Sequence, residues 1–451
     1  MIGATLSRWT MSYFAAALIA LIAAEGLMAA GFGFPAAPIE APETLVVVHL
    51  VAIGWLSLLM CGALFQFVPV LVARPIHDNA LPLPTLVCLV GGLAMLLLGF
   101  LQLAGRVTHG LPFFPAAVGL LVIGFILVAW NLGRTMWAAR PLTLAARFVT
   151  VGLVAFGATV ALGSVFALVL DGIATAGPLV DLTTLGIPVH AAAGLGGWLT
   201  LTAIGVSYRL LAMFMLAPEL DRISSRAVLW LGTAALAVLI IGGVVAICHG
   251  GSLPLALSAA GLLAAASLGL YGNDILYLYR ARKRRKIELN SRMAGAALIS
   301  LAVCIALAVV LIVLGRLGEQ IGAVVFLFSF GWLTGLGLGK LYKIVAFVTW
   351  LETYGPVLGK TPTPRVQDLV VEPRAIKWFW LYFAAVYVAT AALIADTPLI
   401  TRLAASAMLI ATCGIVAQLV RTRCLLDVVD KLRLPAGVRR PQLLYATPRQ
   451  T

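Results

Sequence analysis

The sequence predicts an all-α polytopic membrane protein with about twelve transmembrane helices, arranged in three pseudo-threefold arcs of four, with both termini cytoplasmic. The first observation is composition, since 62% of the 451 residues are hydrophobic and only 11% are charged. The second is a series of apolar runs of roughly 20 residues or more, long enough to cross a bilayer. The third is a short pattern that recurs three times along the chain.

Charged or Pro- and Gly-rich breaks divide the chain into twelve apolar segments. Each is expected to be a helix, because a helix satisfies its own backbone groups inside hydrocarbon and the runs are too long for barrel strands. The first segment is also too long for the apolar core of a signal peptide, so it is expected to be a retained helix. The expected spans are 10–34, 44–72, 83–105, 112–137, 146–171, 185–216, 227–248, 253–280, 293–315, 320–350, 376–395 and 398–420.

The positive charges follow one alternate set of loops. All but three of the 31 Lys and Arg residues fall near the N-terminus, in loops after even-numbered spans, or after the last span; the exceptions are Arg106, Arg316 and Arg402. The positive-inside rule therefore predicts cytoplasmic termini for a multi-pass protein of the inner (plasma) membrane. The net charge of +14 belongs to these loops, with RARKRRK (280–286) the densest, and does not indicate a nucleic-acid partner.

One pattern recurs in the second, sixth and tenth spans. Each contains Gly-Trp-Leu, with its Trp at Trp55, Trp198 and Trp332. Seven and ten residues after each Trp stand a Gly and an aromatic residue: Gly62 and Phe65, Gly205 and Tyr208, Gly339 and Tyr342. The spacing predicts three four-helix repeats, at 1–138, 139–286 and 287–424, followed by a cytoplasmic tail at 425–451. The Gly residues are interpreted as close-packing positions between helices.

Two segments carry a resemblance to a known family. HLVAIGWLSLLMCGALFQFVPVL and PVHAAAGLGGWLTLTAIGVSYRLLAMF are similar to the His-x-His helix of cbb-type oxidases and nitric oxide reductases. With twelve helices in three arcs, the chain resembles subunit I of the haem–copper oxidases over nearly its whole length. In the family's motif two His residues stand eight and six residues before a Trp. Here His49 stands six before Trp55, and His190 stands eight before Trp198.

The departures from this family concern the oxygen-reducing centre. In the family the tenth helix carries both His of the motif, but here those positions are Val324 and Phe326. The family's copper site also needs a His pair at the seventh helix, where this chain has only His249, just past the helix end. We therefore expect a degenerate homologue that lacks the copper site and does not reduce oxygen.

The resemblance implies that the two histidines of this chain bind a haem at a position other than the family's own haem sites. In the family the minus-six His of the tenth helix faces the second helix and the minus-eight His faces the sixth. Moved by one arc, this rule turns His49 and His190 toward each other, as the axial ligands of one bis-His haem b, with Trp55 and Trp198 beside it. Two alternatives remain. Each His is an ordinary interfacial side chain bonded to a carbonyl or water, or only one of them binds iron.

Several further residues are weaker candidates. Arg106 and His109, on the non-cytoplasmic side, are suited to meet haem propionates. Cys248 and His249 form either a copper-ligand pair or an ordinary turn at a helix end. The six cysteines include no CxxC pair, so no Cys-based zinc site is expected.

Glu25 lies deepest among the acidic residues of the spans and is a candidate for proton or cation handling. The preferred function is a membrane b-type haem protein that transfers electrons or senses a gas or redox state. The rival is a haem-free transporter, or a respiratory accessory protein, that moves a small solute, a metal or haem. Expected partners are the lipid bilayer, a redox partner or respiratory complex, and a second copy of the chain.

Overall fold

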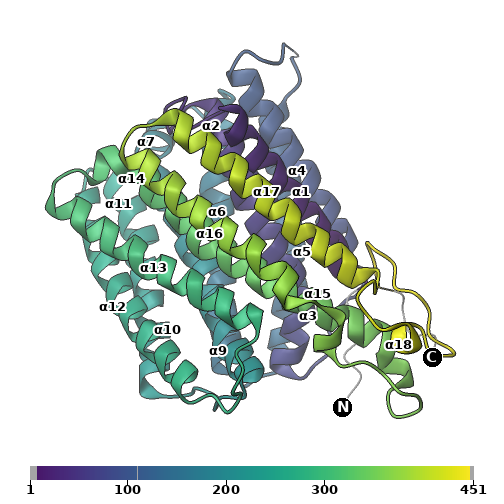
Figure 1. The fold of residues 1–451 in the computed structure, drawn as a ribbon. Coiled ribbons are helices and arrows are strands. Elements are labelled where there is room, and N and C mark those ends of the chain that lie inside the picture. Colours follow the sequence, from purple (N-terminus) through teal and green to yellow (C-terminus); the bar gives the residue numbers. More distant parts are fainter. Residues whose placement is uncertain (1–7, 109, 447–451) are drawn as a thin grey trace. The chain divides into compact units, whose positions relative to one another are not determined.

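The computed structural model describes residues 8–108 and 110–446 and is helical throughout, with no strand among these residues (Figure 1). It contains twelve helices long and apolar enough to cross a membrane, so the predicted spans are confirmed. The largest difference is in the tenth span, predicted to end at residue 350 and ending instead at Val357, because α15 continues to Tyr354 and a short 3-10 turn follows it.

The chain forms two compact units, which are described separately. Unit 1 comprises Met1–Gln66 and Glu288–Thr451, and unit 2 comprises Phe67–Ile287. The helices of unit 1 are α1 (Thr10–Ala30), α2 (Pro42–His49), η1 (Leu50–Ser57), the first part of α3 (Leu58–Val72), α13 (Leu289–Val313), α14 (Leu317–Phe326), η4 (Leu327–Thr334), α15 (Gly335–Tyr354), η5 (Gly355–Val357), η6 (Val366–Leu369), α16 (Glu372–Ile394), α17 (Pro398–Arg423) and α18 (Asp430–Arg433). Within it α16 and α17 run side by side (Figure 1).

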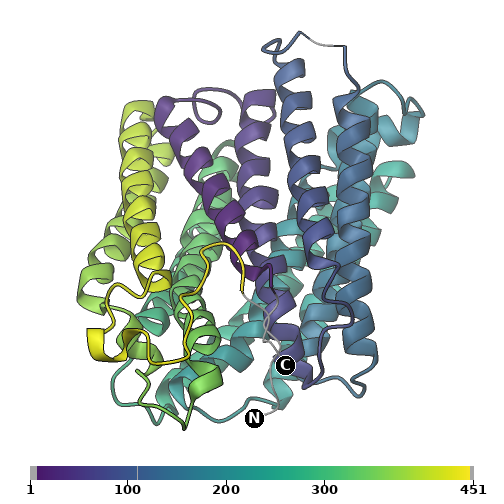
Figure 2. The same ribbon diagram turned by 90° about the vertical axis from the view of Figure 1, so that its right-hand side faces the viewer.

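Unit 2 holds six of the spans and one short helix. Its elements, after the end of α3, are α4 (Pro82–Leu103), α5 (Phe113–Trp137), α6 (Leu144–Leu170), α7 (Gly177–Leu185), α8 (Ile187–Ala192), η2 (Ala193–Leu201), α9 (Thr202–Met215), α10 (Ile223–Ala237), η3 (Val238–Gly242), α11 (Gly243–Cys248) and α12 (Leu253–Arg280). Here α4 and α5 stand side by side (Figure 2).

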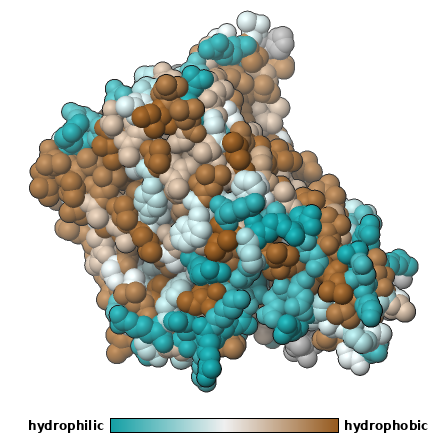
Figure 3. All heavy atoms as spheres, viewed as in Figure 1, coloured by the Kyte–Doolittle hydropathy of each residue, from teal (hydrophilic) through white to brown (hydrophobic). Residues whose placement is uncertain are grey.

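Helix ends follow ordinary sequence rules. Pro stands in the first turn of α2, α4, α8, α12, α16 and α17, where its missing N–H costs no hydrogen bond. Helix α1 ends at Gly31, whose φ of 80° is the left-handed conformation that glycine adopts without strain. Large apolar side chains such as Val154 and Leu262 are exposed on the helix sides, as expected for residues that face lipid, while hydrophilic residues gather around α15, α18 and the C-terminal segment (Figure 3).

The three Gly-Trp-Leu motifs share a backbone conformation that the sequence does not predict. Each lies in a π-helical stretch inside a membrane span: η1, η2 and η4. A π-helix bonds each N–H five residues back and is rare outside short insertions near functional sites. In the second and sixth spans the π-helix begins within three residues of His49 and His190, respectively. The three motifs therefore share a local widening of the helix.

The glycine seven residues after each Trp packs against the preceding long helix of the same repeat. A Cβ added at Gly62 would lie 2.6 Å from Tyr13 Cβ, and one added at Gly339 would lie 2.9 Å from Met293 Cβ. At Gly205 the same position is closer still to Phe148 Cβ. The following aromatic residue repeats the contact in two cases, with Tyr13–Phe65 and Phe148–Tyr208 ring centroids 5.6 Å and 5.8 Å apart. These contacts support the close-packing interpretation, and the boundaries of the repeats stay a prediction.

Candidate functional site

His49 is the last residue of α2 in unit 1, immediately before η1. Its Nδ1 lies 2.8 Å from the carbonyl oxygen of Leu45, one turn earlier. A carbonyl can only accept a hydrogen bond, so Nδ1 carries the proton. The neutral ring then has its lone pair on Nε2. Metal-binding histidines are commonly oriented in this way, by donating the other ring N–H to a backbone carbonyl.

His190 lies in α8 of unit 2, just before η2. Its ring packs on α6, with its centroid 5.4 Å from that of Phe166. Gly163 provides the space, since a Cβ at that position would lie 3.0 Å from Cε1 of His190. The half-buried ring is thus positioned by a neighbouring helix of the same unit. His49 and His190 belong to different units, and their common site stays a prediction.

The Trp residues of the motif are fully buried and make specific contacts. Trp55 donates from Nε1 to Oγ1 of Thr334, at 2.9 Å. Trp198 stacks on Phe156 of α6, with centroids 4.4 Å apart and planes 10° apart. Both side chains therefore contribute to packing within their own units, whatever they contribute to a cofactor site.

The weaker candidates have these positions. Arg106 is exposed just beyond the end of α4, and His109 lies outside the described residues. Cys248 ends α11, with Sγ 4.0 Å from the carbonyl oxygen of Pro178, and the exposed His249 is the C-cap. Over 8–108 and 110–446, no group of three or more His, Cys, Asp or Glu side chains is arranged to hold a metal ion.

At the two positions where the oxidase family has its tenth-helix ligands, this chain has apolar packing. Val324 and Phe326 both lie in α14. The Val324 carbonyl accepts from Sγ of Cys304 at 3.5 Å, and the Phe326 ring lies 4.7 Å from that of Phe330. Neither side chain has an atom that ligates iron or copper, and the expected loss of the oxygen-reducing centre stays a prediction.

Unit 1 also contains a buried polar network around Glu25, which the sequence indicated only through Glu25 itself. The Thr412 hydroxyl donates to Oε1 of Glu25 at 3.0 Å. The Tyr382 hydroxyl, close enough to Glu25 to interact electrostatically, donates to the Phe330 carbonyl at 3.1 Å and also hydrogen bonds with Thr334. Glu25, Thr412, Thr334 and Tyr382 are all 0% exposed.

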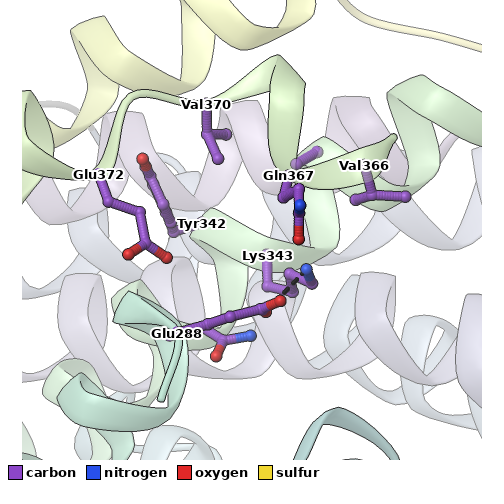
Figure 4. Close-up of a pocket in the computed structure, with 9 residues that line it drawn as sticks. Glu288, Tyr342, Lys343, Val366, Gln367, Val370 and Glu372 are labelled. Atoms are coloured by element: carbon purple, nitrogen blue, oxygen red, sulfur yellow. Dashed lines mark ion pairs between the residues drawn. The ribbon is translucent and has the colours of Figure 1, made fainter. Parts of the chain in front are cut away.

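A second polar cluster surrounds a small hollow in unit 1, drawn in Figure 4. Lys343 of α15 pairs with Glu288 at 2.8 Å, with both side chains 15% exposed. Glu372 of α16 accepts from the Leu289 backbone N–H at 2.8 Å. Lys343 thereby joins α15 to the start of α13. This cluster stabilises helix ends.

Comparison with known proteins gives matches among solved structures. No protein-family model matches the chain, and no curated protein matches it. Among solved structures, it is similar to a haem–copper terminal oxidase dimer determined by cryo-EM, with a TM-score of 0.61 and 12% sequence identity. The alignment covers 97% of this chain and 85% of the oxidase chain. At this identity the likeness establishes the fold alone: the chain folds as twelve membrane-type helices like those of the oxidase.

Proposed function

We propose that this protein is a membrane b-type haem protein on a haem–copper-oxidase-like scaffold, in which His49 and His190 are the axial ligands. In this proposal the protein transfers electrons, or senses a gas or redox state, without reducing oxygen. It resides in the inner membrane with cytoplasmic termini, as the loop charges predict. When bound, a b-type haem supplies a one-electron redox centre.

The observation that carries the proposal is the hydrogen bond from His49 to Leu45. By donating from Nδ1, the imidazole presents Nε2 as its basic nitrogen and fixes the ring orientation. The residue type, the tautomer and the position six residues before a buried Trp all fit an axial ligand. The nearby π-helix η1 is a further feature of functional segments in membrane helices.

His190 supports the proposal from the second unit. Gly163 admits the ring, and Phe166 limits its rotation. An imidazole whose orientation is set before iron binds loses less entropy on ligation, which favours binding. His190 stands eight residues before Trp198, whereas His49 stands six before Trp55. Together they match the two His positions of the family's motif.

The donor set does not fit oxygen reduction. The oxidase-type centre needs a second haem site and a copper site, whereas Val324 and Phe326 replace two of the required imidazoles. The likeness to a solved oxidase supports the scaffold. The chemistry has to be argued from the residues of this chain, because a fold does not determine function. Since that solved structure is a dimer, a homodimer is a natural proposal for the assembly.

An optical spectrum tests the proposal. The full-length protein, purified from haem-replete cells, is expected to show sharp reduced-minus-oxidised α and Soret bands with about one haem per chain. His49→Ala and His190→Ala should each abolish the low-spin spectrum. His249→Ala is the matched control, because His249 is an exposed helix cap, and it should leave the bands unchanged. Bands that survive in both ligand variants contradict the proposal.

The rival function, a haem-free transporter or respiratory accessory protein, is favoured by one observation. Glu25 is a carboxyl group fully buried in a membrane span, and such groups commonly mark solute or ion pathways. A colourless protein purified from haem-replete cells would favour this rival, and uptake of a metal or haem into proteoliposomes would then be measured.

A further inference from the structure

Glu25 has an unusual environment within α1. Its side chain is 0% exposed, and it lies five residues before the end of the helix, about 7–8 Å along the axis. An ionised carboxylate is very unfavourable in an apolar interior without a bound cation. Burial of Glu25 therefore needs either a cation beside it or a proton on it.

The groups around Glu25 do not supply a cation. From α17, Thr412 donates to Oε1, while Arg402 donates from Nε to the Ala29 carbonyl at 3.2 Å, one helical turn away, and its side chain is exposed. From α16, the nearby Tyr382 contributes a hydroxyl. Of the other elements packed against α1, η1 has no titratable side chain, the part of α3 in unit 1 adds Cys61, and α2 adds Glu43 and His49.

The second carboxyl oxygen of Glu25 indicates which group binds there. Oε2 of Glu25 is buried and has no hydrogen-bond partner among the described residues. Buried polar atoms are nearly always paired, so this oxygen is expected to bond a proton, a water or an ion that lies outside the described residues. A hard metal ion would need about six oxygen ligands, but among the described residues only the Thr412 hydroxyl hydrogen bonds to this carboxyl. A proton, with a water molecule to accept its hydrogen bond, fits the geometry.

We propose that Glu25 is a proton-exchange site inside the membrane domain, with Thr412 bonded to Oε1 and the exchangeable proton on Oε2. On release, the Oε2–H bond breaks, water takes the proton, and the carboxylate keeps the electron pair. Uptake reverses this step, so no oxidant or reductant is involved. The site is independent of haem and would act in either function considered above.

The hydrogen-bonded chain of Tyr382, Thr334 and Trp55 near Glu25 does not lead a proton to solvent. Trp55 donates to Thr334, Thr334 bonds with Tyr382, and Tyr382 donates to the Phe330 carbonyl. An indole N–H does not relay protons at neutral pH, so the network ends at Trp55. Exchange with solvent is therefore expected from the end of α1 near Ala30, where Arg402 is exposed.

Infrared difference spectroscopy of the full-length protein tests the proposal. At neutral pH the wild type should show the carbonyl stretch of a protonated carboxyl, and this band should shift down in D2O within the time of buffer exchange. Glu25→Gln should remove the band and Thr412→Val should shift it upward, because one hydrogen bond to the carbonyl is lost. Glu319→Gln changes an exposed glutamate and should leave the band intact.

Three outcomes would overturn the proposal. They are a band that persists in Glu25→Gln, a band that does not shift in D2O over hours, and a band that disappears on addition of Na⁺, which would indicate a cation site. If Glu25→Gln fails to fold, Glu25→Asp serves instead, and the band should move rather than vanish. Because the readout requires no haem, its failure is distinguishable from failure of the haem proposal.

Discussion

The indole Nε1 of Trp55 donates a hydrogen bond to the hydroxyl of Thr334, 2.9 Å away and 279 residues later in the chain. The bond joins η1 to the end of η4, so two of the three π-helical segments that carry Gly-Trp-Leu are tied directly within unit 1. Both side chains are 0% exposed, and an unmade bond at such a place costs about 1–3 kcal/mol.

A double-mutant cycle measures this relationship. Trp55→Phe and Thr334→Val should each lower the apparent melting temperature in detergent, and the double variant should lose less than the sum, with a coupling of about 1 kcal/mol. Thr390→Val is the matched control, because the Thr390 hydroxyl donates to the Val386 carbonyl of its own helix. Additive effects of Trp55→Phe and Thr334→Val would show that the bond contributes nothing.

The repeated glycines should be intolerant of alanine. Each substitution places a methyl group against the Cβ of a residue on a neighbouring helix: Gly62→Ala, Gly205→Ala and Gly339→Ala. Overpacking of this kind costs about 1–3 kcal/mol. Gly133→Ala and Gly269→Ala have nothing within 4 Å of the new methyl, so they should be neutral or stabilising by up to about 1 kcal/mol. Thermal unfolding of the five variants checks the contrast, which would be absent if the repeat were unrelated to packing.

The C-terminal segment is anchored by one buried arginine. Arg423, 3% exposed, pairs with Glu352 at 2.6 Å and donates to the carbonyls of Gln442 and Tyr445 at 2.7 Å and 3.3 Å. Arg423→Ala leaves Glu352 buried without this partner, which costs about 3–5 kcal/mol, and releases residues 442–446. Hydrogen exchange of that segment should accelerate at least tenfold. The exposed Arg439→Ala should leave exchange unchanged, and equal protection in both variants would contradict the anchor.

Acid should weaken the contacts around Asp427. Partial burial raises the pKa of Asp427, but hydrogen bonds from Arg421 and Arg374 outweigh it, so the pKa lies below its ordinary value. A carboxyl with a lowered pKa stabilises the fold above its unfolded pKa of about 3.9, and this stability is lost as the pH falls through the folded pKa. Melting curves between about pH 7 and pH 3 should therefore decline more steeply for wild type than for Asp427→Asn. Asp430→Asn, a change at an exposed residue, should follow wild type.

Much of the fold follows from the sequence because hydrocarbon permits few alternatives. The apolar runs predict all twelve spans, and Gly62, Gly205 and Gly339 indicate the close contacts. Helix periodicity cannot reveal a π-helix, since the wider turn depends on packing and not on composition. The sequence groups Lys340 with the cytoplasmic charges, but packing against other helices buries its side chain inside α15.

The candidate site divides in a similar way. His49, His190 and Glu25 stand out in the sequence because polar groups are costly in apolar segments. Their partners do not stand out. Thr412 lies 387 residues from Glu25, and a single Thr in an apolar helix has no distinguishing pattern. Gly163, which admits the His190 ring, looks like any other membrane glycine.

Imidazole rescue tests the central claim most directly, because it asks whether the two side chains themselves ligate iron. His49→Gly and His190→Gly, each purified in its full-length form, should lose the low-spin reduced spectrum and regain it when imidazole is added, while wild type is unaffected. Restoration in both variants is the result we predict. A wild-type protein without haem bands, or glycine variants whose spectra match wild type before imidazole is added, would contradict the account.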